Sequence, residues 1–411
     1  MAALVCSILD PPLPDLPPPG GLLRSALDCA ARKDWPAARD LLQAALARPE
    51  DRRQAHFLLW EVCQPLGEAE AAIAHLHAAL RDDPLTSRHS ATPRRRVLAL
   101  AVPGDFQANL PLGALLDAAG TALHTLWLTD PEAVLREPLS AFAGRPPPPF
   151  DCVFIAIAED ARHGPALRAA DRLAAALGVP VINRGERIAA LSRVGTARLL
   201  RDLPHAIVPQ QHRVERAALA AGALPAGLDF PVIIRPVASH AGRKLARIDG
   251  PAALRRYLEE VGAGPFHLAP FIDYSSADGL WRKYRVIFVG GRPWPCHMAV
   301  HADWAVWYYN AGMALDAGKQ AEEARFLAHI GDSLPPRAMA ALHAIAERVG
   351  LDYFGLDCGL ARDGRLVMFE VETGMIVHDW DPPAFYPYKH EAFRRIAQAA
   401  EAMIDARIAA A

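Results

Sequence analysis

The sequence predicts an α/β protein that begins with all-α repeats, and three observations predict this fold class. Residues 21–83 are rich in Ala and Leu at helical spacing and repeat with a period of 34 residues. Residues 97–183 alternate continuous apolar runs with helical segments, which is typical of a parallel sheet. Residues 353–371 contain two apolar runs around an Asp-Gly turn, which indicates a β-hairpin.

Composition sets the broad class of the protein. A chain of 411 residues with 52% apolar and 22% charged residues is long enough for two to three globular domains. The net charge of -2 argues against broad nucleic-acid binding through a basic surface. The six cysteines are dispersed without a CxxC pair, so neither a zinc site nor a disulfide framework is indicated. Without a signal peptide or an apolar run of membrane-spanning length, we expect a soluble cytoplasmic protein with no membrane partner.

The first 90 residues are expected to be helical after a proline-rich, extended lead-in at residues 11–20. A shift of 34 residues lays Cys29 on Cys63, and this is the tetratricopeptide period. Pro49 and Pro84 stand where the second helix of each unit should end. Because about three such units normally make a stable solenoid, two units are expected to lean on the rest of the protein or on another subunit. A platform for a protein or peptide partner and a simple helical cap both remain open.

An α/β unit is expected next, after a polar linker at residues 85–95. Its expected strands are residues 97–102, 123–128, 152–158 and 179–183, and its expected helices are residues 112–119 and 167–177. The unit lacks a G-x-G-x-x-G sequence, so dinucleotide binding is not expected.

Three carboxylates stand on the predicted hairpin, whose strands are Tyr353 to Ala361 and Arg365 to Val371. Asp357 lies in the middle of the first strand, and Glu370 and Glu372 point to one face near the end of the second. Carboxylates among Leu, Val, Met and Phe are costly unless a cation binds them. Hard oxygen ligands suit Mg²⁺ or Mn²⁺, and without metal we expect like-charge repulsion to raise at least one pKa in the cluster. The alternative is an edge hairpin with solvated acids.

Cations precede this hairpin at positions that favour phosphate binding. The strand at residues 230–236 carries Arg235, and a small-residue, cationic loop follows with Ser239, His240, Gly242 and Lys244. Such a loop can close over phosphates with backbone N–H groups and fixed positive charge. Further along, Lys283 and Arg285 alternate on a strand, so both can face one side. Arg193 is either another phosphate contact or an exposed arginine of a helix.

The order of Asp, hairpin turn, apolar strand and Glu-x-Asn resembles the metal-binding signature of ATP-grasp enzymes. This chain departs from it in one ligand, because Glu372 stands where Asn is usual. The whole chain resembles tetratricopeptide-repeat proteins fused to an ATP-grasp domain of the ribosomal-protein-glutamate-ligase type, and residues 278–285 and 351–357 carry the likeness best. It implies a tetratricopeptide-like region at residues 1–90, a pre-ATP-grasp α/β domain at 91–190 and an ATP-grasp α+β domain at 191–411.

The resemblance also implies a role for each candidate site residue. The metal, Mg²⁺ or Mn²⁺, would be held by Asp357, Glu370 and Glu372. ATP would be bound by Arg235, Ser239, His240, Gly242 and Lys244, with Asp273 at the ribose. Catalysis would involve Arg285, Lys283 and Asn310. Trp307 to Tyr309 would either line an acceptor pocket or pack in the core.

The implied reaction is the ATP-dependent joining of a carboxylate to an amine through an acyl phosphate. Small molecules or peptides would supply both groups, and a homodimer is left open. Two other classes remain as alternatives. Arg235 and Glu372 suggest a nucleotide-binding regulator or pseudoenzyme without turnover, and the repeats suggest an adaptor whose C-terminal domain is only structural.

Overall fold

The computed structural model describes residues 21–237, 242–262, 264–308, 310–379 and 381–411, and the expected lead-in at residues 11–20 lies outside them. The chain forms two compact units. The first contains the described part of Met1–Ala189 together with Leu351–Phe354 and Glu372–Ala411, and the second contains Ala190–Gly350 and Gly355–Val371.

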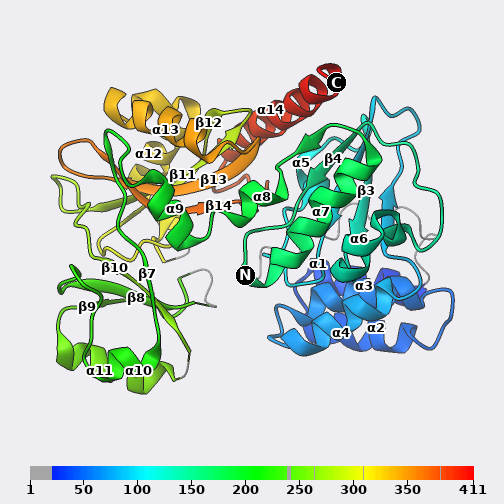
Figure 1. The fold of residues 1–411 in the computed structure, drawn as a ribbon, viewed down its shortest axis with the longest axis horizontal. Helices are drawn as coiled ribbons and strands as arrows, with labels where there is room; N and C mark the ends of the chain where they lie inside the picture. Colours follow the sequence, from blue (N-terminus) through cyan, green and yellow to red (C-terminus); the bar gives the residue numbers. More distant parts are fainter. Residues whose placement is uncertain (1–20, 238–241, 263, 309, 380) are drawn as a thin grey trace. The chain divides into compact units, whose positions relative to one another are not determined.

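The described part of the first unit opens with two helical pairs that repeat in backbone geometry (Figure 1): α1 (Gly21–Ala31), α2 (Trp35–Ala45), α3 (Arg52–Cys63) and α4 (Ala69–Leu80). Lys33 and Gly67, which are 34 residues apart, both have positive φ values, of 63° and 78°. The next residue in each unit is the N-cap of the second helix. The backbone N–H groups of these caps donate to the carbonyls of Cys29 and Cys63, each at 2.9 Å. The 34-residue period of the sequence is thus a period of the backbone.

These helices pack on the α/β part of the same unit. The indole Nε1 of Trp60 donates to the carbonyl of Gly104 at 2.8 Å, and its ring meets those of Trp127 and Phe106 at 5.9 and 5.4 Å between centroids. The expectation that two units lean on the rest of the chain is therefore confirmed.

The α/β part is built on a five-stranded sheet with the order β1-β3-β2-β4-β5. The strands are β1 (Leu85–Arg88), β2 (Arg95–Ala101), β3 (Thr121–Trp127), β4 (Cys152–Ile155) and β5 (Val181–Ile182). The last four are parallel, as predicted, whereas β1 pairs with β3 antiparallel at the edge. The helices of this part are α5 (Leu112–Leu115), α6 (Pro131–Arg136), α7 (Gly164–Leu177) and α8 (Gly185–Ala189).

Two sequence predictions in this part were wrong. Residues 85–95 are not only a linker, because β1 lies there. Its polar sequence hid the strand: Arg88 is buried and donates to the carbonyls of Gly113 and Leu116 at 2.8 and 3.0 Å. The helix expected at residues 112–119 is the single turn α5, because the backbone becomes extended at Leu116.

The C-terminal helix α14 (Lys389–Ala409) belongs to this first unit. The side chain of Arg95 on β2 is fully buried and pairs with Glu401 and Asp405 of α14 at 2.8 and 2.5 Å. Its Nε also donates to the Thr121 hydroxyl at 2.8 Å. A buried guanidinium satisfied by two carboxylates and a hydroxyl ties α14 to the sheet.

The second unit contains two antiparallel sheets. One has the order β7-β10-β8-β9, with β7 (His212–Val214), β10 (Phe266–Pro270), β8 (Val232–Pro236) and β9 (Ala246–Ile248). Helices α10 (Arg216–Ala220) and α11 (Pro251–Val261) cover one of its faces (Figure 1), where Leu219 and Leu254 pack with Ile234 and Leu268. Because side chains alternate along a strand, the neighbours of these core residues in β8 and β10 point to the other face.

The other sheet has the order β12-β11-β13-β14-β6. Its strands are β12 (Arg292–His301), β11 (Trp281–Val289), β13 (Tyr353–Leu360), β14 (Leu366–Glu372) and β6 (Ala206–Ile207), and the helices of this part are α9 (Arg193–Leu200), α12 (Ala317–Ala328) and α13 (Pro336–Val349). The predicted hairpin is confirmed, with Gly364 in its turn at a φ of 79°. Tyr284 of β11 meets Phe326 of α12 with ring centroids 5.1 Å apart, so Lys283 and Arg285 point away from α12.

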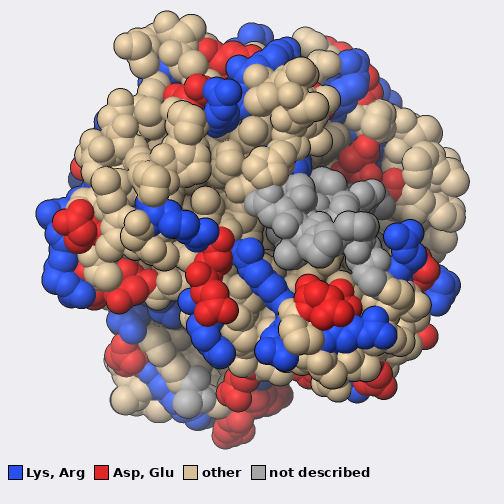
Figure 2. Space-filling model, turned by 90° about the vertical axis from the view of Figure 1, so that its right-hand side faces the viewer, with Lys and Arg blue, Asp and Glu red and all other residues tan. Residues whose placement is uncertain are grey.

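The surface in Figure 2 shows basic and acidic side chains interspersed. On the part of that face that is described, the charges do not form one continuous basic field of the kind that binds a phosphate backbone. Among the helices in the described ranges, none combines the length and apolar character needed to cross a membrane.

Candidate functional site

Asp357 is the centre of the candidate site. It lies in the middle of β13, its side chain is 0% exposed, and both of its oxygens are bound by cations of the neighbouring strand β11. Arg285 donates through Nε to Oδ1 at 2.8 Å and through Nη2 to Oδ2 at 2.9 Å, while Lys283 Nζ lies 2.7 Å from Oδ2. The expectation that Lys283 and Arg285 face one side is thus confirmed.

The cations keep Asp357 ionised. Burial alone would raise the pKa of this carboxyl, but the charges of Arg285 and Lys283 hold that pKa well below its usual range. The pKa of Arg285 is raised in turn, because the attraction of Asp357 outweighs the effect of burial.

Glu370 on β14 is held by two arginines from other elements. Arg193, the first residue of α9, forms a short ion pair with it, and Arg235 of β8 lies 3.9 Å from the same carboxylate oxygen. Burial would raise the pKa of Glu370, yet it is lowered, chiefly by the charge of Arg193. The expectation that repulsion among the acids raises a pKa is therefore wrong for Asp357 and Glu370, because each has cationic partners.

Arg193 was the less certain of the sequence candidates, and the structure places it inside the site. Ser192 caps α9, with its hydroxyl accepting a hydrogen bond from the N–H of Gly195 at 3.2 Å. A capping serine puts the next side chain at the first turn of the helix, which is a position suited to anion contacts. That cap was the sequence signal for Arg193.

Glu372 ends β14, two residues after Glu370, and is assigned to the first unit. Its Oε1 accepts a hydrogen bond from the N–H of Gly374 at 3.2 Å, which closes the turn after the strand. The structure therefore gives the Glu372 carboxylate a local partner, and its role as a metal ligand stays a prediction.

The expected phosphate loop is described only in part. Ser239 and His240 lie outside the described residues. Gly242 and Lys244 are exposed and both have positive φ values, of 68° and 56°, so the backbone turns sharply on this side of the loop. The hydroxyl of Tyr257 donates to the carbonyl of Lys244 at 2.7 Å and anchors the end of the loop to α11.

Two further predicted residues lie on exposed loops. Asp273 follows β10, and its carboxylate accepts the N–H of Ser275 at 2.8 Å; this backbone contact lowers its pKa. The side-chain amide of Asn310 closes its own loop, because it accepts the N–H of Trp307 at 2.9 Å and donates to the carbonyl of Ala305 at 3.0 Å. Neither bond links Asn310 to Asp357 or Glu370, so its catalytic role stays a prediction.

The aromatic segment before Asn310 divides between packing and exposure. The Tyr308 hydroxyl donates to the fully buried Glu323 at 3.0 Å, and its ring meets that of His297 at 5.1 Å. Trp307 is 43% exposed, and Tyr309 lies outside the described residues. Core packing therefore accounts for Tyr308, whereas Trp307 is accessible to an acceptor.

The donor set fits a hard divalent cation. Metal binding requires ionised carboxylates, and both Asp357 and Glu370 have lowered pKa values. In the described ranges, no three His, Cys, Asp or Glu side chains are arranged to hold a metal ion. Mg²⁺ usually takes one or two carboxylates and completes its shell with water and substrate phosphates, so two acids are enough of a protein contribution.

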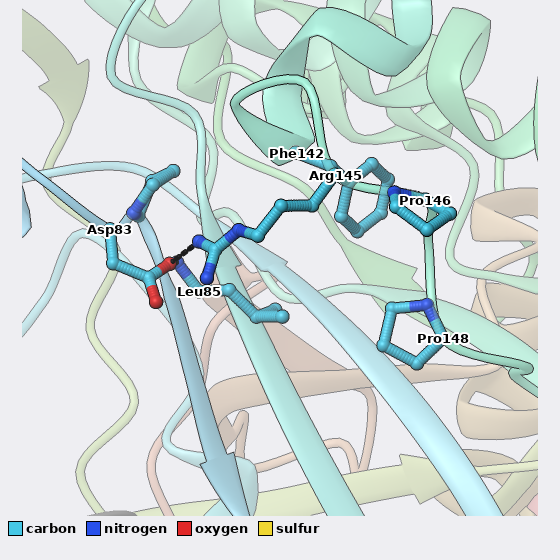
Figure 3. Close-up of a pocket in the computed structure, with 7 residues that line it drawn as sticks. Asp83, Leu85, Phe142, Arg145, Pro146 and Pro148 are labelled. Atoms are coloured by element: carbon cyan, nitrogen blue, oxygen red, sulfur yellow. Dashed lines mark hydrogen bonds and ion pairs between the residues drawn. The ribbon is translucent and has the colours of Figure 1, made fainter.

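A small cavity of about 140 Å³ lies elsewhere, in the first unit, and contains none of the predicted site residues (Figure 3). It is lined by Asp83, Pro84, Leu85, Phe142, Arg145, Pro146 and Pro148. The guanidinium of Arg145 points to Asp83 and pairs with it at 2.5 Å. Its only charged groups are already paired, so the cavity offers packing space rather than chemistry.

Comparisons with known proteins were made at the levels of sequence and structure. No protein-family model and no curated protein matches the sequence. Among solved structures, the chain is similar to a RimK-domain ATP-grasp protein from Sphaerobacter thermophilus, with 16% identity, a TM-score of 0.44, and coverage of 76% of this chain and 99% of the other. It is similar to the D-alanine-D-alanine ligase of Coxiella burnetii, with 13% identity, a TM-score of 0.44, and coverage of 76% and 96%.

A third similar structure is the ATP-grasp ligase PsnB in complex with a precursor variant, Mg and ADP, with 14% identity, a TM-score of 0.43, and coverage of 77% of this chain and 99% of the other. The similar solved structures named here are thus ATP-grasp ligases.

Proposed function

We propose that this protein is an ATP-dependent carboxylate–amine ligase that uses Mg²⁺ and an acyl phosphate. The observation that carries the proposal is the pair of ion-paired acids in the second unit: Asp357 with Lys283 and Arg285, and Glu370 with Arg193 and Arg235. Four cations and two ionised carboxylates are the parts needed to bind a metal–triphosphate and to neutralise a phosphoryl group in transfer. The sequence resemblance to ATP-grasp enzymes supports the same reading.

Each side chain has a defined task in this proposal. Asp357 and Glu370 would hold Mg²⁺, with Glu372 as the third ligand in place of the usual Asn. The metal would neutralise phosphate charge and fix the phosphate geometry. Arg235, Lys244 and the loop with Ser239, His240 and Gly242 would bind the phosphates, and Asp273 the ribose.

The reaction would proceed in two displacements. A carboxylate oxygen of the first substrate attacks the γ-phosphorus, the bond to the bridging oxygen breaks, and ADP leaves. The amine nitrogen then attacks the acyl carbon, loses a proton, and phosphate leaves. Lys283 and Arg285 would balance negative charge on the transferring group, with Asn310 nearby, and positioning alone can contribute about 7–11 kcal/mol.

We also propose that α1 to α4 are two tetratricopeptide-like units that can present a surface to a protein or peptide partner. The support is the matched backbone at Lys33 and Gly67 and at the two N-caps that follow them.

Nucleotide binding tests the proposal at its first step. Arg235→Ala should weaken Mg-ATP binding by about 1.5–3 kcal/mol, the value of a charge-assisted hydrogen bond. Arg255→Ala, on an exposed position of α11, is the matched control and should bind as wild type. Equal affinities of wild type and Arg235→Ala in a calorimetric titration would refute the assignment.

The nucleotide-binding regulator is the second candidate, and the occupied state of Asp357 favours it. Both oxygens of this acid already have cationic partners, so metal binding requires Lys283 and Arg285 to share it. ADP release that depends on an added carboxylate and amine distinguishes a ligase from a regulator that binds Mg-ATP without turnover.

A further inference from the structure

A row of three side chains crosses the four-stranded sheet of the second unit. His267 of β10 lies directly opposite Arg213 of β7 on one side and Arg235 of β8 on the other. Residues directly opposite each other on neighbouring strands project to the same face of the sheet. The flanking residues Phe266 and Leu268 pack with α10 and α11, so the row points to the opposite, uncovered face.

The row faces the carboxylate Glu370. Arg235, the neighbour of His267 in the row, lies 3.9 Å from Glu370, and Arg193 pairs with the same acid. Both arginines also act electrostatically on His267. The imidazole is therefore part of the cationic wall around Glu370, although sequence analysis did not single it out.

The imidazole of His267 has hydrogen-bonding capacity that no described residue uses. Its Nδ1 atom is buried and has no hydrogen-bond partner among the described residues. A buried polar atom without a partner normally costs stability, and an apolar side chain would fill this position without that cost. A ligand atom that pairs with the ring removes the difficulty.

The charge state of the ring limits what that ligand can be. Burial, followed by the charges of Arg193, Arg235 and Arg213, lowers the pKa of His267 to about 4. The ring is thus neutral at pH 7 and offers one N–H donor and one acceptor nitrogen. With three arginines around it, an anionic oxygen is the atom that the surroundings attract, and the ring N–H can donate to it.

We infer that His267 is a phosphate-binding residue of the nucleotide site, where its neutral imidazole donates a hydrogen bond to a phosphate oxygen beside Arg235. This inference rests on the proposed function, because it assumes that the site binds ATP. It adds a hydrogen bond whose strength does not require the imidazole to be charged at pH 7.

The test compares nucleotides that differ in phosphate content. Affinities of wild type, His267→Phe and His267→Asn for Mg-ATP, Mg-ADP and adenosine are measured by calorimetry. His267→Phe should lose about tenfold or more in affinity for Mg-ATP, as expected for a hydrogen bond to a charged group, with adenosine affinity unchanged. His267→Asn should recover part of the loss, because its amide keeps a donor near the position of Nδ1.

The matched control is His212→Phe, because His212 lies on the adjacent strand opposite Leu268 and therefore on the other face. It should bind Mg-ATP as wild type. Wild-type Mg-ATP affinity in His267→Phe would overturn the inference, and so would an equal loss for adenosine, which would indicate a base or ribose contact. If wild type itself binds no Mg-ATP, the proposed function fails instead, so the two failures are distinguishable.

Discussion

Arg285 holds Asp357 through two parallel hydrogen bonds, from Nε to Oδ1 at 2.8 Å and from Nη2 to Oδ2 at 2.9 Å. The carboxylate is completely buried, whereas the guanidinium side chain keeps 25% of its surface exposed. The pair thus links a buried acid of β13 to the accessible face of the sheet, where Glu370 is also held. Stability and the proposed chemistry depend on the same two residues.

Loss of Arg285 should therefore destabilise the fold. Arg285→Leu leaves a buried carboxylate with Lys283 as its remaining cationic partner among the described residues, and breaking a buried pair from one side costs about 3–5 kcal/mol. Arg365→Leu is the matched control, because it removes an exposed pair with Asp363 that contributes only about 0–1 kcal/mol. Denaturant unfolding of both variants measures the difference, and equal losses would contradict the role of burial.

The buried acid Glu61 on α3 should make stability fall as pH rises. Burial raises its pKa to about 8, and its Oε2 has no hydrogen-bond partner among the described residues. A folded-state pKa above the unfolded value means that the folded protein keeps the proton, so stability is lost progressively between pH 4.5 and 8. The loss at pH 7 is roughly 3 kcal/mol.

Glu61→Gln removes this titration and should raise the melting temperature at pH 7.5 but not at pH 4.5. Glu70→Gln, at an exposed position of α4, serves as control and should change neither value. A gain from Glu61→Gln that is the same at both pH values would argue against a buried, protonated acid.

The two helical units should respond in opposite directions to exchanging their turn residues. Lys33 and Gly67 occupy equivalent left-handed positions, where glycine has no steric penalty and other residues cost about 1 kcal/mol. Lys33→Gly should therefore stabilise the protein, and Gly67→Lys should destabilise it by a similar amount. Thermal unfolding of both variants tests this, and destabilisation by Lys33→Gly would show that the turns are not equivalent.

Glu372→Asn tests whether the unusual third acid is needed. An Asn side-chain oxygen can accept the N–H of Gly374 as Glu372 does, and it is the residue usual at this place in ATP-grasp enzymes. If Glu372 acts as a metal ligand, the variant should keep Mg²⁺-dependent ATP turnover. Retained Mg-ATP binding with loss of amine-dependent ADP release would instead assign Glu372 to the acceptor.

The parts of the fold that were predictable are those with local sequence signals. The Asp-Gly turn between Leu360 and Leu366 fixed the hairpin, since such a turn needs only its own residues. The apolar run of β2 and the 34-residue period of the helices are local in the same sense. The acids and cations of the site followed from strand alternation, which placed Lys283 and Arg285 on one face.

The remaining features depend on contacts between distant residues. Arg95 pairs with Asp405 across 310 positions, so its burial under α14 leaves no local trace in the sequence. His267 reads as an ordinary polar residue of a strand until its neighbours Arg213 and Arg235 are known. The polar strand β1 was missed because its burial depends on carbonyls supplied by residues 113 and 116.

The most direct test of the central claim is ADP formation by Glu370→Ala in the presence of Mg-ATP and a panel of carboxylates and amines. Glu370 is the acid that Arg193 and Arg235 share, so its loss should abolish Mg²⁺-dependent, amine-dependent ADP release while circular dichroism shows a retained fold. Glu347→Ala, on an exposed position of α13, should react as wild type. Unchanged ADP release by a folded Glu370→Ala would contradict the account.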